Sequence, residues 1–449
     1  MCRSAFRTPH SAFGISHHRE IAPMKSLLRG VKKRSAVVPR PLLVISSAVA
    51  LSLLGDQMLY AVLPAVHEAV GVPVTAVGLL LSANRLIRLL TNSLAGYVIE
   101  RFGRHWPFVL ALLLGGITTV AYGVVYGVWA FLVVRLLWGT AWSFIRIEGM
   151  STALDVASEE TRGRYMGLFQ AISRIGSAIA LLAGGIFADA IGFRTTFILF
   201  GACTCSAALL AHVERRRPCA TGMPPALPQV TAPPLPALCT TTPRVLDTLT
   251  RWRMGVASFG TFTTFLVSSL VSATLGYMLR TRFGATPVLG AVPVGMASLT
   301  GVLLSIRGFL DLGFAPVAGY LADHWGQHRV IATAMSMSIL MVAALALPSP
   351  LWCVIGLLLA VAITGVTLNV TFNAMAGDMA PPGKRSMFLS LFVTCQDLGA
   401  ATGPLLGYWI GPAFGVDWLY LSGAFILLLA SLLHVVTFSS ARLFSRPLS

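Results

Sequence analysis

The sequence predicts an all-α integral membrane protein whose twelve transmembrane helices form two pseudo-symmetric six-helix halves. Three observations predict this fold. Apolar residues make up 56% of the chain and charged residues only 11%, whereas about a quarter of the residues in a typical soluble protein are charged. Twelve apolar runs are each long enough to cross a bilayer, which takes about 20 helical residues. A set of residues also recurs at a constant offset of 223 positions.

The apolar runs set the predicted organisation of the chain. Helices are the expected spanning element, because the short alternating segments of a membrane β-barrel are absent from the sequence. The runs cover residues 42–64, 74–99, 106–126, 129–152, 165–187, 193–213, 255–278, 294–320, 329–347, 352–376, 386–410 and 416–438. We expect a basic cytoplasmic tail at 1–41, a first half at 42–213, a cytoplasmic linker at 214–253, a second half at 254–438 and a cytoplasmic tail at 439–449.

Basic residues are distributed unevenly between the two sides of the predicted membrane. The net charge of +17 could indicate nucleic-acid binding. However, 27 lysines and arginines lie outside the predicted spans or at their first two residues, and 24 of these fall on the side of the N-terminus. Only Arg194, Arg280 and Arg282 fall on the other side. This positive-inside bias predicts that both termini are cytoplasmic and argues against nucleic acid as a partner.

Two polar segments flank the first half. Residues 1–41 carry nine basic residues and one acid without a signal-peptide pattern. They either attract anionic lipid or form a disordered tail, with Met24 as an alternative start. Residues 214–253 contain eight prolines, which is typical of an extended linker. The linker has no glycine-rich phosphate loop, so it offers no site for an ATP-driven pump.

The second half repeats the first without a gap over about a hundred residues. Such duplication is expected of parallel repeats related by an axis along the membrane normal. Equivalent residues at the offset of 223 include Ala95 and Ala318, Tyr97 and Tyr320, Asp155 and Asp378, Arg162 and Arg385, Gly176 and Gly399, and Gly192 and Gly415.

A charged turn rich in glycine joins the second and third apolar runs and recurs in the second half. The copies read Gly96-Tyr97-Val98-Ile99-Glu100-Arg101-Phe102-Gly103-Arg104-His105 and Gly319-Tyr320-Leu321-Ala322-Asp323-His324-Trp325-Gly326-Gln327-His328. The first copy resembles the signature loop of the major facilitator superfamily, in which a glycine is followed by an acid, a base, a second glycine and two bases. The second copy has His324 and Gln327 where bases are usual. The resemblance implies secondary active transport by alternating access, with a cytoplasmic gate at Gly96, Glu100, Arg101, Gly103, Arg104, Asp155, Gly319, Asp323, Gly326 and Asp378.

Two helix motifs resemble those of the drug/proton antiporters in this family. Arg135-Leu136-Leu137-Trp138-Gly139 resembles the fourth-helix motif, with Trp138 in the place of a glutamine. The resemblance implies a role for Arg135 in proton coupling. In the fifth helix Ala180-Leu181 replaces the Gly-Pro pair of these antiporters, whereas the eleventh helix contains Gly403-Pro404.

Several charged residues lie inside the apolar runs, where a charge costs about 2.5–3.5 kcal/mol on insertion scales. Asp56 shares a helix face with Tyr60. It is either a functional carboxylate or a structural partner of Arg85. Arg85 and Arg88 share a face of the second helix, and that face must look into the protein.

Charged residues of opposite sign occupy equivalent positions in the two halves. Arg88 corresponds to Asp311 at the offset of 223, and Arg174 corresponds to Asp397. In the resembled fold, helix 2 faces helix 11 and helix 5 faces helix 8, which implies the pairs Arg88–Asp397 and Arg174–Asp311. We expect these pairs to close in the outward-facing state, to separate in the inward-facing state, and to weaken when an aspartate is protonated. Alternatively, Asp311 pairs within its own helix with Arg307.

Charge and motifs together lead to a functional hypothesis. Six arginines lie within the spans against four acids, a surplus that suits an anionic substrate. We expect proton-coupled export of a small organic compound, anionic or drug-like, by a monomer in a bacterial-type inner membrane, driven by the proton gradient without a cofactor or metal. The alternatives are a proton symporter importing an organic anion and a non-transporting sensor or scaffold. No nucleophile, base and acid combine as in an enzyme. The candidate coupling residues are Asp56, Arg85, Arg88, Arg135, Arg174, Arg307, Asp311 and Asp397.

Overall fold

The computed structural model describes residues 38–157, 162–216, 248–284, 288–289, 292–379 and 385–443. Most of the predicted tail at 1–41, the centre of the predicted linker at 214–253 and the last residues of the predicted tail at 439–449 lie outside these ranges. All the described helices belong to one unit that begins at Arg40.

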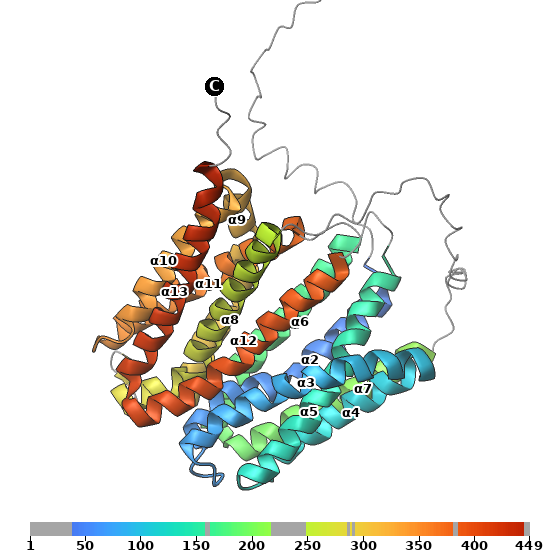
Figure 1. The fold of residues 1–449 in the computed structure, drawn as a ribbon. Coiled ribbons are helices and arrows are strands. Elements are labelled where there is room, and N and C mark those ends of the chain that lie inside the picture. Colours follow the sequence, from blue (N-terminus) through green and yellow to red (C-terminus); the bar gives the residue numbers. More distant parts are fainter. Residues whose placement is uncertain are drawn as a thin grey trace, which may run out of the picture. The chain divides into compact units, whose positions relative to one another are not determined.

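Within the described residues, the chain forms twelve long helices and one antiparallel pair of two-residue strands, β1 (Val288–Leu289) and β2 (Val292–Pro293) (Figure 1). This confirms the predicted all-α fold. The helices are α2 (Arg40–Val66), α3 (Val74–Phe102), α4 (His105–Tyr122), α5 (Val128–Asp155), α6 (Arg162–Ile191), α7 (Phe193–Arg216), α8 (Thr248–Phe283), α9 (Met296–Trp325), α10 (Gln327–Ala344), α11 (Leu351–Met379), α12 (Arg385–Phe414) and α13 (Val416–Leu443).

Ten of these helices are long and apolar enough to cross a membrane on their described residues. The helices α10 and α12 fall short of that measure, although the sequence predicts spans at 329–347 and 386–410. Both carry polar residues that lower their hydropathy: α10 begins with Gln327-His328-Arg329, and α12 contains Gln396 and Asp397. Neither helix stands alone, because α10 packs against α11 and α13, and α12 packs against α3 and α8.

The repeat extends to the backbone of the two signature turns. Gly103 follows the last residue of α3 with φ +79°, and Gly326 follows the last residue of α9 with φ +85°. Glycine adopts positive φ without the steric cost that a Cβ imposes. Each turn reverses the chain directly into the next helix. We call the end of the helices that carries these turns the Gly103 end and the opposite end, with residues 66–74, the Glu68 end.

The first half, which consists of helices α2 to α7, meets the second half, α8 to α13, along two main helix pairs. Figure 1 shows α12 beside α3, and α6 contacts α9 even more extensively. These are the helix pairs that face one another in the resembled fold. Glycines allow the close approach. A Cβ on Gly185 of α6 would clash with the carbonyl oxygen of Ala297 in α9, and one on Gly78 of α3 would clash with that of Pro404 in α12.

Candidate functional site

Two adjoining cavities lie between the helix sets, with volumes of about 340 Å³ and 260 Å³. The larger is lined by both sets, through residues of α2, α3 and α6 on one side and of α8, α9, α11 and α12 on the other. The smaller lies mainly within the first set and reaches α12 at Asp397. Both cavities are lined by Gln57, Tyr60, Arg85, Arg174 and Ser177.

The two predicted ion pairs between the halves are present. Arg88 Nη2 of α3 lies 3.7 Å from Asp397 Oδ1 of α12, and Arg174 Nη1 of α6 lies 3.4 Å from Asp311 Oδ2 of α9. The local alternative is not formed: Arg307 donates instead to the carbonyl oxygen of Ser268 (3.1 Å) and to side-chain hydroxyls of α8. All four paired residues line the cavities.

Other polar contacts between the halves lie toward the Glu68 end. Arg280 Nη2 lies 3.3 Å from both carboxylate oxygens of Glu68, and the Ser298 hydroxyl donates to Asp189 at 2.6 Å. With the predicted orientation, the Glu68 end is the outer end. The ion pairs are therefore formed together with contacts between the halves at this end. Their closing in the outward-facing state and their separation in the inward-facing state stay predictions.

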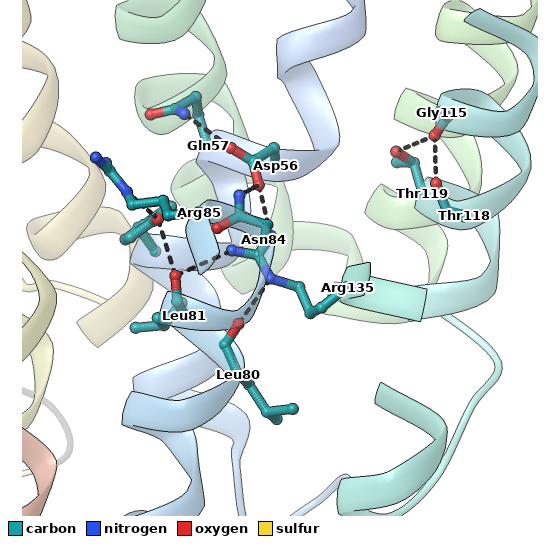
Figure 2. A network of polar contacts seen from close by, with 11 residues as sticks. Asp56, Gln57, Leu80, Leu81, Asn84, Arg85, Gly115, Thr118, Thr119 and Arg135 are labelled. Atoms are coloured by element: carbon teal, nitrogen blue, oxygen red, sulfur yellow. Dashed lines mark hydrogen bonds and ion pairs between the residues drawn. The ribbon is translucent and has the colours of Figure 1, made fainter. Parts of the chain in front are cut away.

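Asp56 forms the centre of a buried polar network inside the first half (Figure 2). Its Oδ1 accepts hydrogen bonds from Arg135 Nη1 (2.5 Å) and Asn84 Nδ2 (2.9 Å), and its Oδ2 accepts one from Gln57 Nε2 (3.0 Å). The Asp56 and Arg135 side chains are only 5% and 0% exposed. The structural partner of Asp56 is therefore Arg135, and the sequence-based alternative of Arg85 is wrong.

The remaining donors of this network fix helix α3 against α5. Arg135 Nε donates to the Leu80 carbonyl at 2.9 Å and Nη2 to the Leu81 carbonyl at 3.4 Å. Tyr60 also donates to Leu81, and its hydroxyl accepts from Arg85 Nε at 3.5 Å. Each of the three guanidinium nitrogens of Arg135 thus donates a hydrogen bond, whereas Arg85 lines both cavities.

Three arginines that line the cavities have no carboxylate within 4.0 Å among the described residues: Arg85, Arg146 and Arg307. The lining of the two cavities therefore carries more arginines than aspartates, in agreement with the surplus of arginines in the sequence. Glu148 does not line either cavity; it is buried in α5, where it accepts from Thr152.

The signature turns form equivalent contacts in the two halves. Arg104 forms an ion pair with Asp155 at the end of α5. At the same offset, Gln327 donates to Asp378 at 2.8 Å. Glu100 is exposed, and no hydrogen bond or ion pair links it to the Arg104–Asp155 pair among the described residues. Two members of the implied gate thus meet, and Glu100 stays apart in this conformation.

The other members of the predicted gate surround these turns without joining them. Arg101 donates to the Tyr97 hydroxyl at 2.7 Å, and Asp323 is exposed. A Cβ on Gly96 or Gly319 would meet nothing within 4 Å. These two glycines are therefore not required for close packing in this conformation.

Sequence reasoning missed several residues of the site. Asn84 and Gln57 hold Asp56, and the stacked rings of Trp138 and Trp142, with centroids 5.6 Å apart, line the smaller cavity. Ser268 and Ser272 hold Arg307. The serines are four residues apart on one helix face, a spacing that could have marked them as polar groups facing the interior.

The fold and the charged cavity between two repeated halves define a membrane transporter. The family model of the Major Facilitator Superfamily matches residues 45–310 and 257–446. The chain belongs to this superfamily.

Relatives and solved structures agree with this class. The multidrug resistance protein MdtG of Proteus mirabilis strain HI4320 is 24% identical over 331 residues, which cover 71% of this chain and 75% of that protein. MdtG of Escherichia coli O17:K52:H18 is 22% identical over 352 residues, 78% of this chain and 81% of that protein. A bacterial homolog of the human lysosomal transporter Spinster, solved in an inward-facing and unoccupied conformation, matches with a TM-score of 0.70 at 15% identity over 91% of this chain and 98% of that one. It shares the fold.

Proposed function

We propose that this transporter exports small organic compounds in exchange for protons by alternating access. The observation that carries the proposal is the pair of cavity-lining aspartates, Asp311 and Asp397, each joined to an arginine of the opposite half. Each aspartate can bind a proton, and each proton removes one attraction between the halves. Proton binding and relative movement of the halves are therefore linked equilibria, which is the requirement for coupling.

The position of these aspartates supports a proton path. The Asp311 side chain is 28% exposed and that of Asp397 is 20% exposed. A proton from the cavity can therefore reach each carboxylate while the carboxylate remains in the interface. Asp56 is different, because three donors hold its carboxylate and Arg135 neutralises it. We assign Asp56 and Arg135 to holding α2, α3 and α5 together.

The direction of transport and the compounds carried are proposed from the relatives. MdtG proteins are described as multidrug resistance proteins, which supports efflux of drug-like or other small organic compounds. The charge distribution supports a bacterial-type inner membrane with both termini in the cytoplasm. The driving force would be the proton gradient, with a single chain as the working unit.

A direct test uses proteoliposomes of known orientation with a pH-sensitive dye inside. Panels of lipophilic cations, neutral drugs and organic anions are added on one side. Antiport predicts that protons and a transported compound move in opposite directions. Movement of both in the same direction would replace export with symport. That alternative is favoured for an anion by Arg85, Arg146 and Arg307, which have no described carboxylate within 4.0 Å. Compound movement without any proton movement would contradict coupling.

A further inference from the structure

Resting on the proposed transport function, we propose that Arg85 of α3 and Arg307 of α9 together bind the anionic group of an aromatic organic anion. The two side chains come from different halves and line the same 340 Å³ cavity. The anion would bridge them, with its aromatic body reaching past Arg85 toward Trp142 in the adjoining cavity.

The charges of the cavities leave these arginines available. Five arginines line the two cavities, against three aspartates. Each aspartate is already within 4.0 Å of one arginine: Asp56 of Arg135, Asp311 of Arg174 and Asp397 of Arg88. Arg135 is not a lining residue, so the lining arginines without a carboxylate partner are Arg85, Arg146 and Arg307 among the described residues.

Among the described residues, Arg85 and Arg307 donate hydrogen bonds only to neutral groups. Arg85 donates to the Tyr60 hydroxyl at 3.5 Å, a long hydrogen bond. Arg307 donates to the Ser268 carbonyl and to the hydroxyls of Ser268 and Ser272. Both side chains are half-buried. Cations removed from bulk water are stabilised by an opposite charge, and a guanidinium offers a carboxylate or phosphate two parallel N–H donors.

The two guanidinium groups carry like charges on opposite sides of one cavity and repel each other across the interface, while Asp311 attracts Arg307. Without an anion, this repulsion opposes closer approach of α3 and α9. An anion between them replaces the repulsion with two attractions. The filled site therefore favours a closed cavity more than the empty site does, so that the two halves close around a bound anion.

The adjoining cavity suits an aromatic body. Trp138 and Trp142 stack with an interplanar angle of 12°, and both line this cavity beside Phe169. Trp138 Nε1 is buried and has no hydrogen-bond partner among the described residues. Aromatic rings prefer offset-stacked or edge-to-face neighbours. A flat ring attached to the anionic group would supply such a neighbour to the half-buried Trp142.

The test is equilibrium binding to the full chain in lipid nanodiscs at one pH, with no gradient. The probes are 4-nitrobenzoate and 2-naphthoate, each compared with its uncharged amide of the same shape. We expect each carboxylate to bind at least about tenfold more tightly than its amide, and Arg85→Gln or Arg307→Gln to weaken carboxylate binding by about tenfold or more. Arg329→Gln, at an exposed arginine of α10 away from both cavities, should leave binding unchanged.

Two further variants separate charge from folding. Arg85→Lys and Arg307→Lys keep the positive charge but lose the two-donor fork, so they should bind carboxylate more tightly than the glutamine variants and less tightly than the unmodified chain. Equal binding of acid and amide, or carboxylate binding that survives both glutamine variants, would overturn the proposal. The two arginines would then not be part of an anion-binding site. Because no gradient is used, this result is independent of whether protons are coupled.

Discussion

Arg88 and Asp397 lie 3.7 Å apart between Nη2 and Oδ1, and this pair joins α3 of one half to α12 of the other. The side chains are 10% and 20% exposed, so the pair lies where solvent screens it weakly. The Arg174–Asp311 pair joins α6 to α9 with the arginine again in the first half. Two halves derived from one repeat thus attract each other through charges that differ between the copies.

The first prediction concerns this attraction. Arg88→Asp places two like charges at the interface, and Asp397→Arg does the same with the opposite sign. Each single variant should reduce transport by about tenfold or more, because two like charges then lie side by side where solvent screens them weakly. The double variant Arg88→Asp/Asp397→Arg restores the attraction and should recover a substantial part of transport in proteoliposomes. A double variant as inactive as the single variants would show that attraction between these two residues is not needed for transport.

The second prediction concerns the buried Asp56–Arg135 pair. Replacing Arg135 alone by Leu leaves the Asp56 carboxylate uncompensated, and should lower the free energy of unfolding by about 3–5 kcal/mol. The double variant Asp56→Leu/Arg135→Leu removes both charges and should be less destabilised than the single variant. The second half supports this reasoning, because the position equivalent to Arg135 is Leu358.

Thermal unfolding in detergent measures both Leu variants against the exposed control Arg329→Gln. A double variant that unfolds at a lower temperature than Arg135→Leu would show that the pair stabilises the fold beyond neutralising its own charges.

The third prediction concerns the contact of α6 with α9. Gly185→Ala places a Cβ against the backbone carbonyl of Ala297, so the helices must separate locally. Gly167→Ala on the same helix meets nothing within 4 Å and is the matched control. Spin labels at the exposed residues Trp129 and Leu347, one in each half near the Glu68 end, should report longer distances in Gly185→Ala only. Unchanged distances would mean that the interface tolerates the Cβ by another adjustment.

The fourth prediction concerns the signature turn. Arg104→Gln gives the first half the side chain that the second half has at Gln327, which donates to Asp378. Because Arg104 and Asp155 are 43% and 51% exposed, the ion pair should contribute no more than about 1 kcal/mol to stability. We expect a nearly unchanged Tm and a slower transport rate. A Tm lowered as strongly as in Arg135→Leu would assign the turn a structural role.

The repeat made part of this site predictable. A gap-free offset of 223 aligns Arg88 with Asp311 and Arg174 with Asp397, and the resembled fold states which helices face each other. Depth and helix pairing together then determine the partners. The same reasoning failed for Asp56, because its partner depends on helix rotation: one residue along a helix turns a side chain by about 100°. Asn84 therefore points to Asp56, whereas Arg85 points into the cavities.

Other features required the packed structure. The partners of Arg307 depend on how closely α8 approaches α9, and the closed interface at the Glu68 end depends on backbone contacts at Gly185 and Gly78. Apolar periodicity carries no such information, because a membrane-spanning helix can be apolar on all sides. The conformation in which the ion pairs form is likewise a property of the packing and not of any one motif.

The central claim is that protonation of the interface aspartates couples protons to the movement of the halves. The most direct measurement compares the unmodified chain with Asp311→Asn/Asp397→Asn in proteoliposomes, using one transported compound. Asparagine mimics the protonated carboxyl, so the variant should still exchange the compound across the membrane but should not accumulate it when a pH gradient is imposed. Accumulation by the variant that equals that of the unmodified chain would contradict the claim.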